Sequence, residues 1–163
     1  MEMFIVKNLV GGIVVIKVPN ENRIFELKGL DSRVKISYDD LEKMVYDADS
    51  RRIFETGLAW IEDKDCRIRL GLEEEDGTAN FEKLILDKKQ IISLLYAESF
   101  KTFKEKLDQL SEGSKELLIS VAIENPKQLD YEKSDVIRKK FLIDVEGIKR
   151  MKREEEVEKT KEG

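Results

Sequence analysis

The sequence predicts an α+β protein, in which a small N-terminal antiparallel β unit with short helices is followed by a C-terminal helical lobe. Three observations predict this class. The first 36 residues contain four short runs of mostly β-branched residues, separated by Gly, Pro and Asn turns. After them, apolar residues recur at helical spacing behind typical capping residues. Between the two parts, EEEDGTAN at 73–80 is polar, acidic and contains a Gly turn.

Four short strands are expected before residue 37. MFIVKNL and IVVIKV are separated by Gly11-Gly12, which predicts a hairpin turn between them. PNEN at 19–22 is the next turn, and RIFELKGL and RVKI supply two further strands. We expect a small antiparallel sheet or open barrel, whose uncovered edges can pair with another chain.

Two short helices and one more strand complete the first lobe. Ser37 is expected to cap a helix, with Asp40 in the acidic position of a capping box. A second helix, in DSRRIFE, is expected to end at Gly57. The apolar run LAWI predicts a strand that returns to the first sheet.

Beyond residue 86 the pattern is almost wholly helical. Asp87, Ser99 and Asp130 predict helix starts, and a further apolar helical stripe ends before Pro126. One last helix is expected from near Asp130 through residue 148, and the charged segment beyond about residue 150 is expected to fray unless a partner orders it. The predicted organisation is a β-rich lobe at 1–72, a linker at 73–86, a helical lobe at 87–150 and a charged tail at 151–163.

The composition excludes several chemistries. The chain has 163 residues, 35 acids against 30 Lys and Arg, a formal net charge of −5, and no histidine. Ser-His-Asp and Cys-His catalysis and histidine metal ligation are therefore excluded. A single cysteine favours a reducing compartment. The acidic balance is unlike that of a general nucleic-acid binder, no apolar run approaches the ~20 residues of a membrane span, and the first residues do not resemble a signal peptide.

The single cysteine, Cys66, lies in the charged stretch WIEDKDCRIRLGLEEED at 60–76. Two interpretations are open. Alternation with Arg67 and Arg69 fits a strand paired with LAWI, whereas Asp63 as a cap and a stop at Gly71 fit a short helix, which the boundary signals favour. In either case, a cysteine without a histidine to activate it is expected to be a small buried apolar residue.

Two weak patterns suggest metal chemistry. Glu26-x-Lys28 and Glu62-x-Lys64 resemble the carboxylate and lysine pairing of Mg²⁺ nucleases. EDKDCRIRLGLE at 62–73 and EEEDGTANFEKL at 73–84 loosely imitate Ca²⁺ loops. Such short patterns are common in a highly charged chain, and neither has the accompanying ligands at the required positions. We therefore predict no enzyme, no catalytic residues, no metal ligands and no cofactor.

A small set of residues is expected to contact partners. Trp60 is large enough to anchor a core or an interface. Basic pairs and the C-terminal basic cluster suit either phosphates or solubility, and without a phosphate loop or interleaved aromatics, nucleic acid is the less favoured partner. The candidate partner contacts are Trp60, Arg51, Arg52, Lys149, Arg150, Lys152 and Arg153.

A longer pattern covers residues 35–73, KISYDDLEKMVYDADSRRIFETGLAWIEDKDCRIRLGLE. It combines a Y-[DE]-x-L helix start, an Arg-containing turn, a Gly-Leu-x-x-Ile-Glu-Asp segment and a Leu-Gly-Leu-Glu ending. With these features it resembles small accessory virion proteins of tailed bacteriophages. Residues 91–123 of this chain also resemble the helical lobe of those proteins. The segment YDADSRR departs from the pattern, because a proline or glycine would be expected there. The matching residues are Tyr38, Leu41, Arg51, Gly57, Leu58, Ile61, Glu62, Asp63, Leu70, Gly71, Leu72 and Glu73.

The resemblance implies a non-enzymatic structural or adaptor protein of a phage particle, associated with the capsid or connector. It implies a virion location after assembly in the host cytoplasm, and contacts with other virion proteins in a multi-copy assembly. The residues themselves leave an alternative open, a cytoplasmic regulatory protein that binds nucleic acid or a host protein through the helical lobe. In the first case the sheet edge and the terminal segments are the expected contact surfaces.

Overall fold

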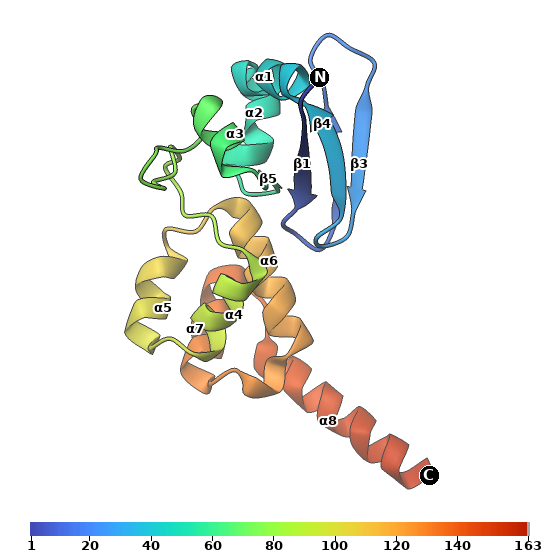
Figure 1. The fold of residues 1–163 in the computed structure, drawn as a ribbon. Helices are drawn as coiled ribbons and strands as arrows, with labels where there is room; N and C mark the ends of the chain where they lie inside the picture. The colour runs from blue at the N-terminus through green and yellow to red at the C-terminus, as the bar shows by residue number, and fades with distance from the viewer. Residues whose placement is uncertain (163) are drawn as a thin grey trace. The chain divides into compact units, whose positions relative to one another are not determined.

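A computed structural model describes residues 1–162 and divides the chain into two compact units. The first unit comprises Met1–Asp87 and Gln109–Leu117, and the second comprises Lys88–Asp108 and the chain from Leu118 onward. Antiparallel strands lie in the N-terminal half and helices dominate the C-terminal half (Figure 1), which confirms the predicted α+β class. Among the described residues, no helix combines the length and the apolar character needed to cross a membrane.

The four expected strands are present, but their pairing differs from the prediction. β1 pairs with β4 on one side and with the later strand β5 on the other, and β2 pairs only with β3. The predicted β1–β2 hairpin at Gly11-Gly12 is therefore wrong, and the hairpin turn lies between β2 and β3. The strands are β1 Met3–Asn8, β2 Ile13–Lys17, β3 Ile24–Lys28, β4 Arg33–Ser37 and β5 Ala59–Ile61.

The first four strands form one long antiparallel ribbon that bends in the middle. Pairing continues past β1 and β4 through Asn8 N–H to the Ser32 carbonyl (2.9 Å), and resumes where Gly29 N–H meets the Gly12 carbonyl (3.1 Å). Residues 9–11 on one strand face residues 30–31 on the other, so one strand carries an extra residue at the bend. Such an offset is the signature of a bulge, which bends a ribbon and interrupts its ladder.

Asn8 satisfies the backbone at this bend. Its side chain is fully buried. The amide nitrogen donates to the carbonyls of Gly12 (2.8 Å) and Leu27 (3.0 Å), and the amide oxygen accepts from the N–H of Val10 (2.8 Å). Gly11-Gly12 thus marks a bend that a buried amide holds, instead of a tight turn.

Three short helices cover the ribbon, and a side chain caps the N-terminus of each. The caps at Ser37 and Asp63 were predicted, whereas the cap at Asp47 was not. Ser37 accepts from the N–H of Asp40, Asp47 from that of Ser50 and Asp63 from that of Cys66. The helix around Cys66 is therefore the correct interpretation. These helices and the inner face of the ribbon enclose one apolar core. The helices are α1 Tyr38–Tyr46, α2 Ala48–Glu55 and α3 Lys64–Arg69.

The segment expected as a linker, 73–86, makes ordered contacts within the first unit. It forms backbone hydrogen bonds with Gln109–Leu117, the later section that belongs to the same unit. Leu84 N–H donates to the Gln109 carbonyl (2.7 Å), and the Leu84 carbonyl accepts from Ser111 N–H (2.8 Å). Gly113 N–H also donates to the Thr56 carbonyl (2.7 Å), and a Cβ at Gly113 would come within 2.5 Å of the Gly57 carbonyl oxygen. This close approach explains why a glycine lies in a helix here.

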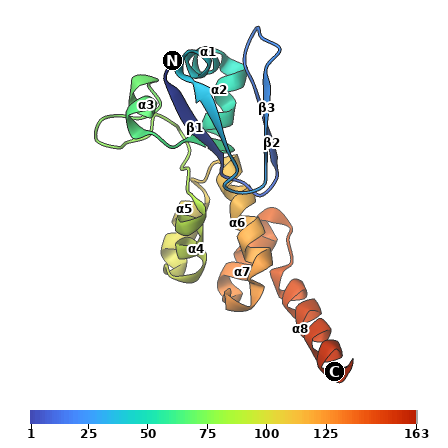
Figure 2. The ribbon, with the colours of Figure 1, turned by 45° about the vertical axis from the view of Figure 1, so that its right-hand side comes forward.

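The second unit is helical (Figure 2), with α5 and α7 capped by Ser99 and Asp130 as expected. The prediction of a single last helix was wrong, because Leu142 takes a left-handed conformation (φ 59°) and separates two helices. The second of them continues through Glu162, where fraying was expected. The elements after α3 are α4 Lys88–Tyr96, α5 Phe100–Leu107, α6 Glu112–Glu124, a 3-10 turn at Pro126–Gln128, α7 Tyr131–Phe141 and α8 Val145–Glu162. The residues of α6 up to Leu117 belong to the first unit.

Buried lysines complete helix ends in this unit. Lys133, on α7, is 2% exposed, and its ammonium donates to the carbonyls of Leu95 (2.8 Å), Leu94 (3.3 Å) and Glu98 (2.6 Å) at the end of α4. The last carbonyls of a helix have no partner within it, so a cation there supplies both hydrogen bonds and a favourable charge.

Candidate interaction surfaces

The β2–β3 part of the ribbon presents one buried face and one exposed face. Val14, Ile16 and Leu27 point into the core and are at most 4% exposed. Their neighbours along the strands point outward, as the two-residue period of a strand requires. We call the outward side the ribbon face, and it consists of Ile13, Val15, Lys17, Ile24, Glu26 and Lys28.

The ribbon face is half apolar although it is exposed. Ile13, Val15 and Ile24 are 66%, 49% and 57% exposed. The register places Ile13 opposite Lys28, Val15 opposite Glu26, and Ile24 opposite Lys17, so each apolar side chain has a charged neighbour across the strand. Val15 and Ile24 are also diagonal neighbours, within reach of each other. The face therefore offers a small apolar area within a mixed charged border.

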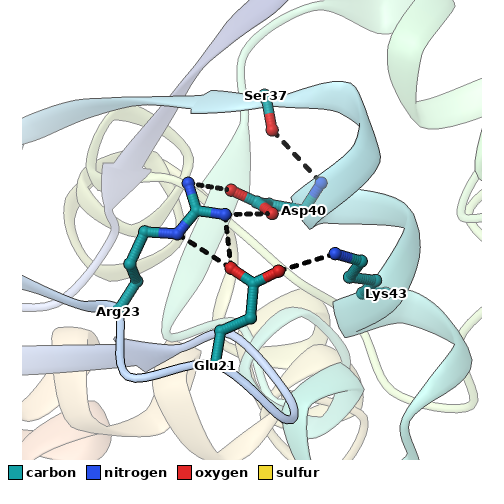
Figure 3. A network of polar contacts seen from close by, with 5 residues as sticks. All are labelled: Glu21, Arg23, Ser37, Asp40 and Lys43. Carbon is teal, nitrogen blue, oxygen red and sulfur yellow. Dashed lines mark hydrogen bonds and ion pairs between the residues drawn. The ribbon is translucent and has the colours of Figure 1, made fainter.

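The tip of the ribbon is fastened to α1 by a polar network (Figure 3). The guanidinium of Arg23 meets both carboxylate oxygens of Asp40, at 3.0 Å each, and also bonds to Glu21. Lys43 donates to the other oxygen of Glu21 at 2.7 Å. Bidentate Arg–carboxylate pairs fix geometry as well as charge. We call this network, with Glu21, Arg23, Asp40 and Lys43, the tip latch.

The electrostatics of the tip latch are balanced. The hydrogen bonds from Lys43 and then from Arg23 lower the pKa of the Glu21 carboxyl, and the Glu21 bond raises the pKa of both cations. Asp40 is 3% exposed and lies under Arg23, whereas Ser37 caps its backbone N–H. Asp40 thus pairs with the ribbon instead of closing the expected capping box.

The ribbon face is held at both ends. Asn8 fixes the bend at its base, and the tip latch fixes the turn at its far end. A surface whose backbone is already fixed loses little conformational entropy on binding. The ribbon face is accordingly a preorganised surface that has no covering element within its own unit.

Trp60 lies on β5, at an edge of the three-stranded sheet, and is half-buried. Its ring makes an edge-to-face contact with Phe81 (6.3 Å between centroids), and the Arg67 guanidinium lies 5.0 Å from it. Arg67 is in turn held by Glu73 at 2.8 Å and by the Ile61 carbonyl at 2.6 Å. Trp60 therefore packs the sheet against the 73–86 segment, and only part of its ring is accessible to a partner.

The other candidate contacts fall into two groups. Arg51 pairs with Glu55 (2.6 Å), and Lys149 and Lys152 donate to backbone carbonyls, of Leu129 for Lys149 and of Ile123 and Glu124 for Lys152. These three side chains serve local structure. The members of the second group, Arg52, Arg150 and Arg153, are exposed. Of the other basic pair, Lys139 forms an ion pair with Asp135 and Lys140 forms one with Asp108.

Cys66 is fully buried in the first core. Burial raises the pKa of its thiol to about 11, and the nearby charge of Asp63 acts in the same direction. A thiol with a raised pKa is a poor nucleophile at neutral pH. The structure therefore gives Cys66 a packing role.

The two Glu-x-Lys patterns lie in different parts of the first unit, one on β3 and one just after β5. Glu26 belongs to the ribbon face, and Glu62 follows β5 and pairs with Arg33 at 2.6 Å. In the acidic turn, Asp76 accepts from the N–H of Thr78, which lowers the pKa of its carboxyl. Among the described residues no group of three metal-ligating side chains occurs.

The ribbon face and the tip latch were not among the sequence candidates. The sequence did carry a signal for the ribbon face, since the strand IVVIK places two apolar residues on each of its two sides. No sequence signal distinguishes which side is covered, because that depends on how the ribbon bends. The tip latch joins residues 17 positions apart, Arg23 and Asp40, that no short motif connects.

No protein-family model, curated protein or solved structure matches this chain in comparisons with known proteins. The resemblance to accessory phage proteins therefore stays a prediction.

Proposed function

We propose that this chain is a non-enzymatic structural or adaptor protein of a phage particle, which acts through protein–protein contacts. The observation that carries the proposal is the ribbon face, with three exposed β-branched side chains on a backbone fixed at both ends. Exposed apolar clusters rimmed by charge are typical of protein interaction sites.

The chemistry of the ribbon face suits a protein partner. Its apolar centre favours another apolar surface, and Lys17, Lys28 and Glu26 provide charged contacts at the border. Interfaces of this kind combine a buried apolar centre with a polar rim. A particle also supplies many identical partner sites, so that a small contact area per copy is sufficient when copies are held together.

The proposal is tested by quantitative mass spectrometry of purified particles against soluble lysate from the source. The wild-type chain is expected at a fixed stoichiometry in particles. A triple variant, Ile13→Thr, Val15→Thr and Ile24→Thr, keeps β-branched residues in the strands but removes the apolar area. It is expected to fold with the wild-type melting temperature and to be at least about tenfold depleted from particles, because central apolar contacts carry most binding energy.

A matched control removes as many exposed apolar side chains elsewhere. Met3, Tyr46 and Tyr131 are 48%, 83% and 70% exposed, and their replacement by threonine is expected to leave incorporation unchanged. Absence of the wild-type chain from particles would refute the phage assignment. Equal incorporation of both triple variants would refute the role of the ribbon face.

A further inference from the structure

The corner between α7 and α8 carries an apolar knob beside an apolar groove. Leu142, at the corner, is 87% exposed. The adjacent groove, of about 510 Å³, is lined by Leu142 itself and by Ile123, Ile143, Ile148 and Met151. Met151 is 62% exposed and Ile123 36%. All of these residues belong to the second unit.

The backbone at the knob is itself unusual. Leu142 has φ 59° and ψ 32°, a left-handed conformation in which glycine or asparagine is the ordinary residue after a helix. A large apolar side chain here is disfavoured by the backbone and gains nothing from burial within its unit. Strained, exposed residues of this kind cluster at functional sites.

The border of the groove carries charges of both signs. Arg150, Asp144 and Glu154 line it, and all three are exposed. The inward side of α8 is used differently, because Lys149 and Lys152 donate to carbonyls within the unit. The knob, the groove and the mixed charges therefore share the outward side of one helix corner.

We propose that this corner is a self-association surface, in which Leu142 of each copy enters the groove of a second copy of the chain. A surface that holds both a knob and a groove is complementary to itself under a two-fold axis, since each contact is then made twice. The same axis lets Arg150 of one copy meet the Asp144 or Glu154 carboxylate of the other. One side chain and one groove per copy carry the apolar contact, so we expect a weak dimer, with Kd of about 10–100 µM.

This inference stands apart from the proposed function, because it concerns a different surface and the purified chain alone tests it. Sedimentation equilibrium from about 5 to 500 µM brackets the expected Kd. The wild-type mass is expected to rise from monomer to dimer across this range. A mass that stays monomeric throughout would overturn the proposal, and would mean that another protein or nothing occupies the groove.

The decisive variant is Leu142→Gly, which separates folding from association. Glycine accepts the left-handed backbone, so the variant is expected to melt at or above the wild-type temperature. It is expected to dimerise at least about tenfold more weakly, because the knob is gone. Unchanged dimerisation would overturn the proposal.

Two further variants test the groove and the specificity of the effect. Met151→Ser, in the groove, is expected to weaken the dimer as Leu142→Gly does. Val157→Ser is the matched control on the same helix, since Val157 is 53% exposed but does not line the groove. A control that weakens dimerisation as much as Met151→Ser would contradict the assigned surface.

Discussion

The two units satisfy backbone carbonyl groups outside the regular ladders by different means. In the first unit, the bend of the ribbon needs donors and an acceptor at one place, and the neutral amide of Asn8 provides both. In the second unit, helix ends present only acceptors, and lysine ammonium groups supply the donors: Lys133 at the end of α4 and Lys152 at the end of α6. The kind of polar residue that is buried thus follows from the kind of backbone it completes.

This difference changes how basic residues should be interpreted in the helical unit. A cluster such as Lys149, Arg150, Lys152 and Arg153 suggests a phosphate-binding surface from sequence. In the structure, its two lysines turn inward to carbonyls and its two arginines remain outside. Substitutions that remove one of these donors at a time test whether the two units depend on these residues as strongly as the contacts suggest.

The largest effect is expected for Lys133→Met. Methionine keeps most of the side-chain volume but leaves the carbonyls of Leu94, Leu95 and Glu98 without their donor. Buried acceptors that lose a charged partner cost about 3 kcal/mol of the free energy of unfolding. Urea unfolding measures the loss. Lys139→Met is the control, since Lys139 is exposed and solvent screens its ion pair with Asp135, so that little stability should be lost.

A loss below about 1 kcal/mol for Lys133→Met, in the range of an ordinary exposed hydrogen bond, would contradict this role of the lysine.

Asn8→Ala is expected to have the next largest effect, about 2 kcal/mol, because it leaves the buried N–H of Val10 without its acceptor and removes one hydrogen bond from each of the Gly12 and Leu27 carbonyls. The comparison is sharpened by hydrogen exchange, which should show faster exchange in β2 and β3. Asn80→Ala is the control, since Asn80 makes one exposed hydrogen bond to the Gly71 carbonyl. Equal effects of the two substitutions would show that the bend does not depend on the buried amide.

Lys152→Met is expected to cost about 1 kcal/mol, less than Lys133→Met, because Lys152 is half-buried and water can replace part of its contact. Hydrogen exchange at the C-terminal end of α6 should increase. Arg153→Met, at the exposed neighbouring position, should leave that exchange unchanged. If both substitutions speed exchange alike, the lysine does not act as a helix cap.

The smallest effect is a pH dependence of the tip latch. The folded pKa of Glu21 lies below its ordinary value, so its contribution is fully present above the usual glutamate range and is lost as the pH falls through the folded pKa. Hydrogen exchange of residues 18–23, corrected for its intrinsic pH dependence, should therefore accelerate at acidic pH. In Glu21→Gln this acceleration should vanish, and its persistence would show that another group controls the tip.

Local structure followed from the sequence where one short motif decides it. Ser37, Asp63 and Ser99 each cap the helix expected of them, because capping depends only on residues three or four positions apart. The bend at Gly11-Gly12 was misinterpreted because a Gly pair permits both a tight turn and a bulge. Which of them forms is decided by distant pairing, between Asn8 and Ser32.

The interaction surfaces were less predictable for the same reason. Arg150 was a sequence candidate, and the groove border includes it. Leu142 was not, because periodicity placed it within a continuous helix, and its exposure depends on the turn between α7 and α8. The apolar residues of the ribbon face alternate as in any half-buried strand, so only the three-dimensional path of the ribbon shows which of them remain outside.

The return of Gln109–Leu117 to the first unit has a consequence for how the chain is made. A ribosome releases the chain from its N-terminus, so the first 87 residues emerge before the section that pairs with Leu84 and Thr56. Residues 88–108 of the second unit are synthesised in between, before the first unit has all its parts. The first unit therefore cannot complete its fold until residue 117 has been synthesised. A chain that ends after Asp87 is expected to lack the hydrogen bonds that hold Leu84 and Thr56 to the later section.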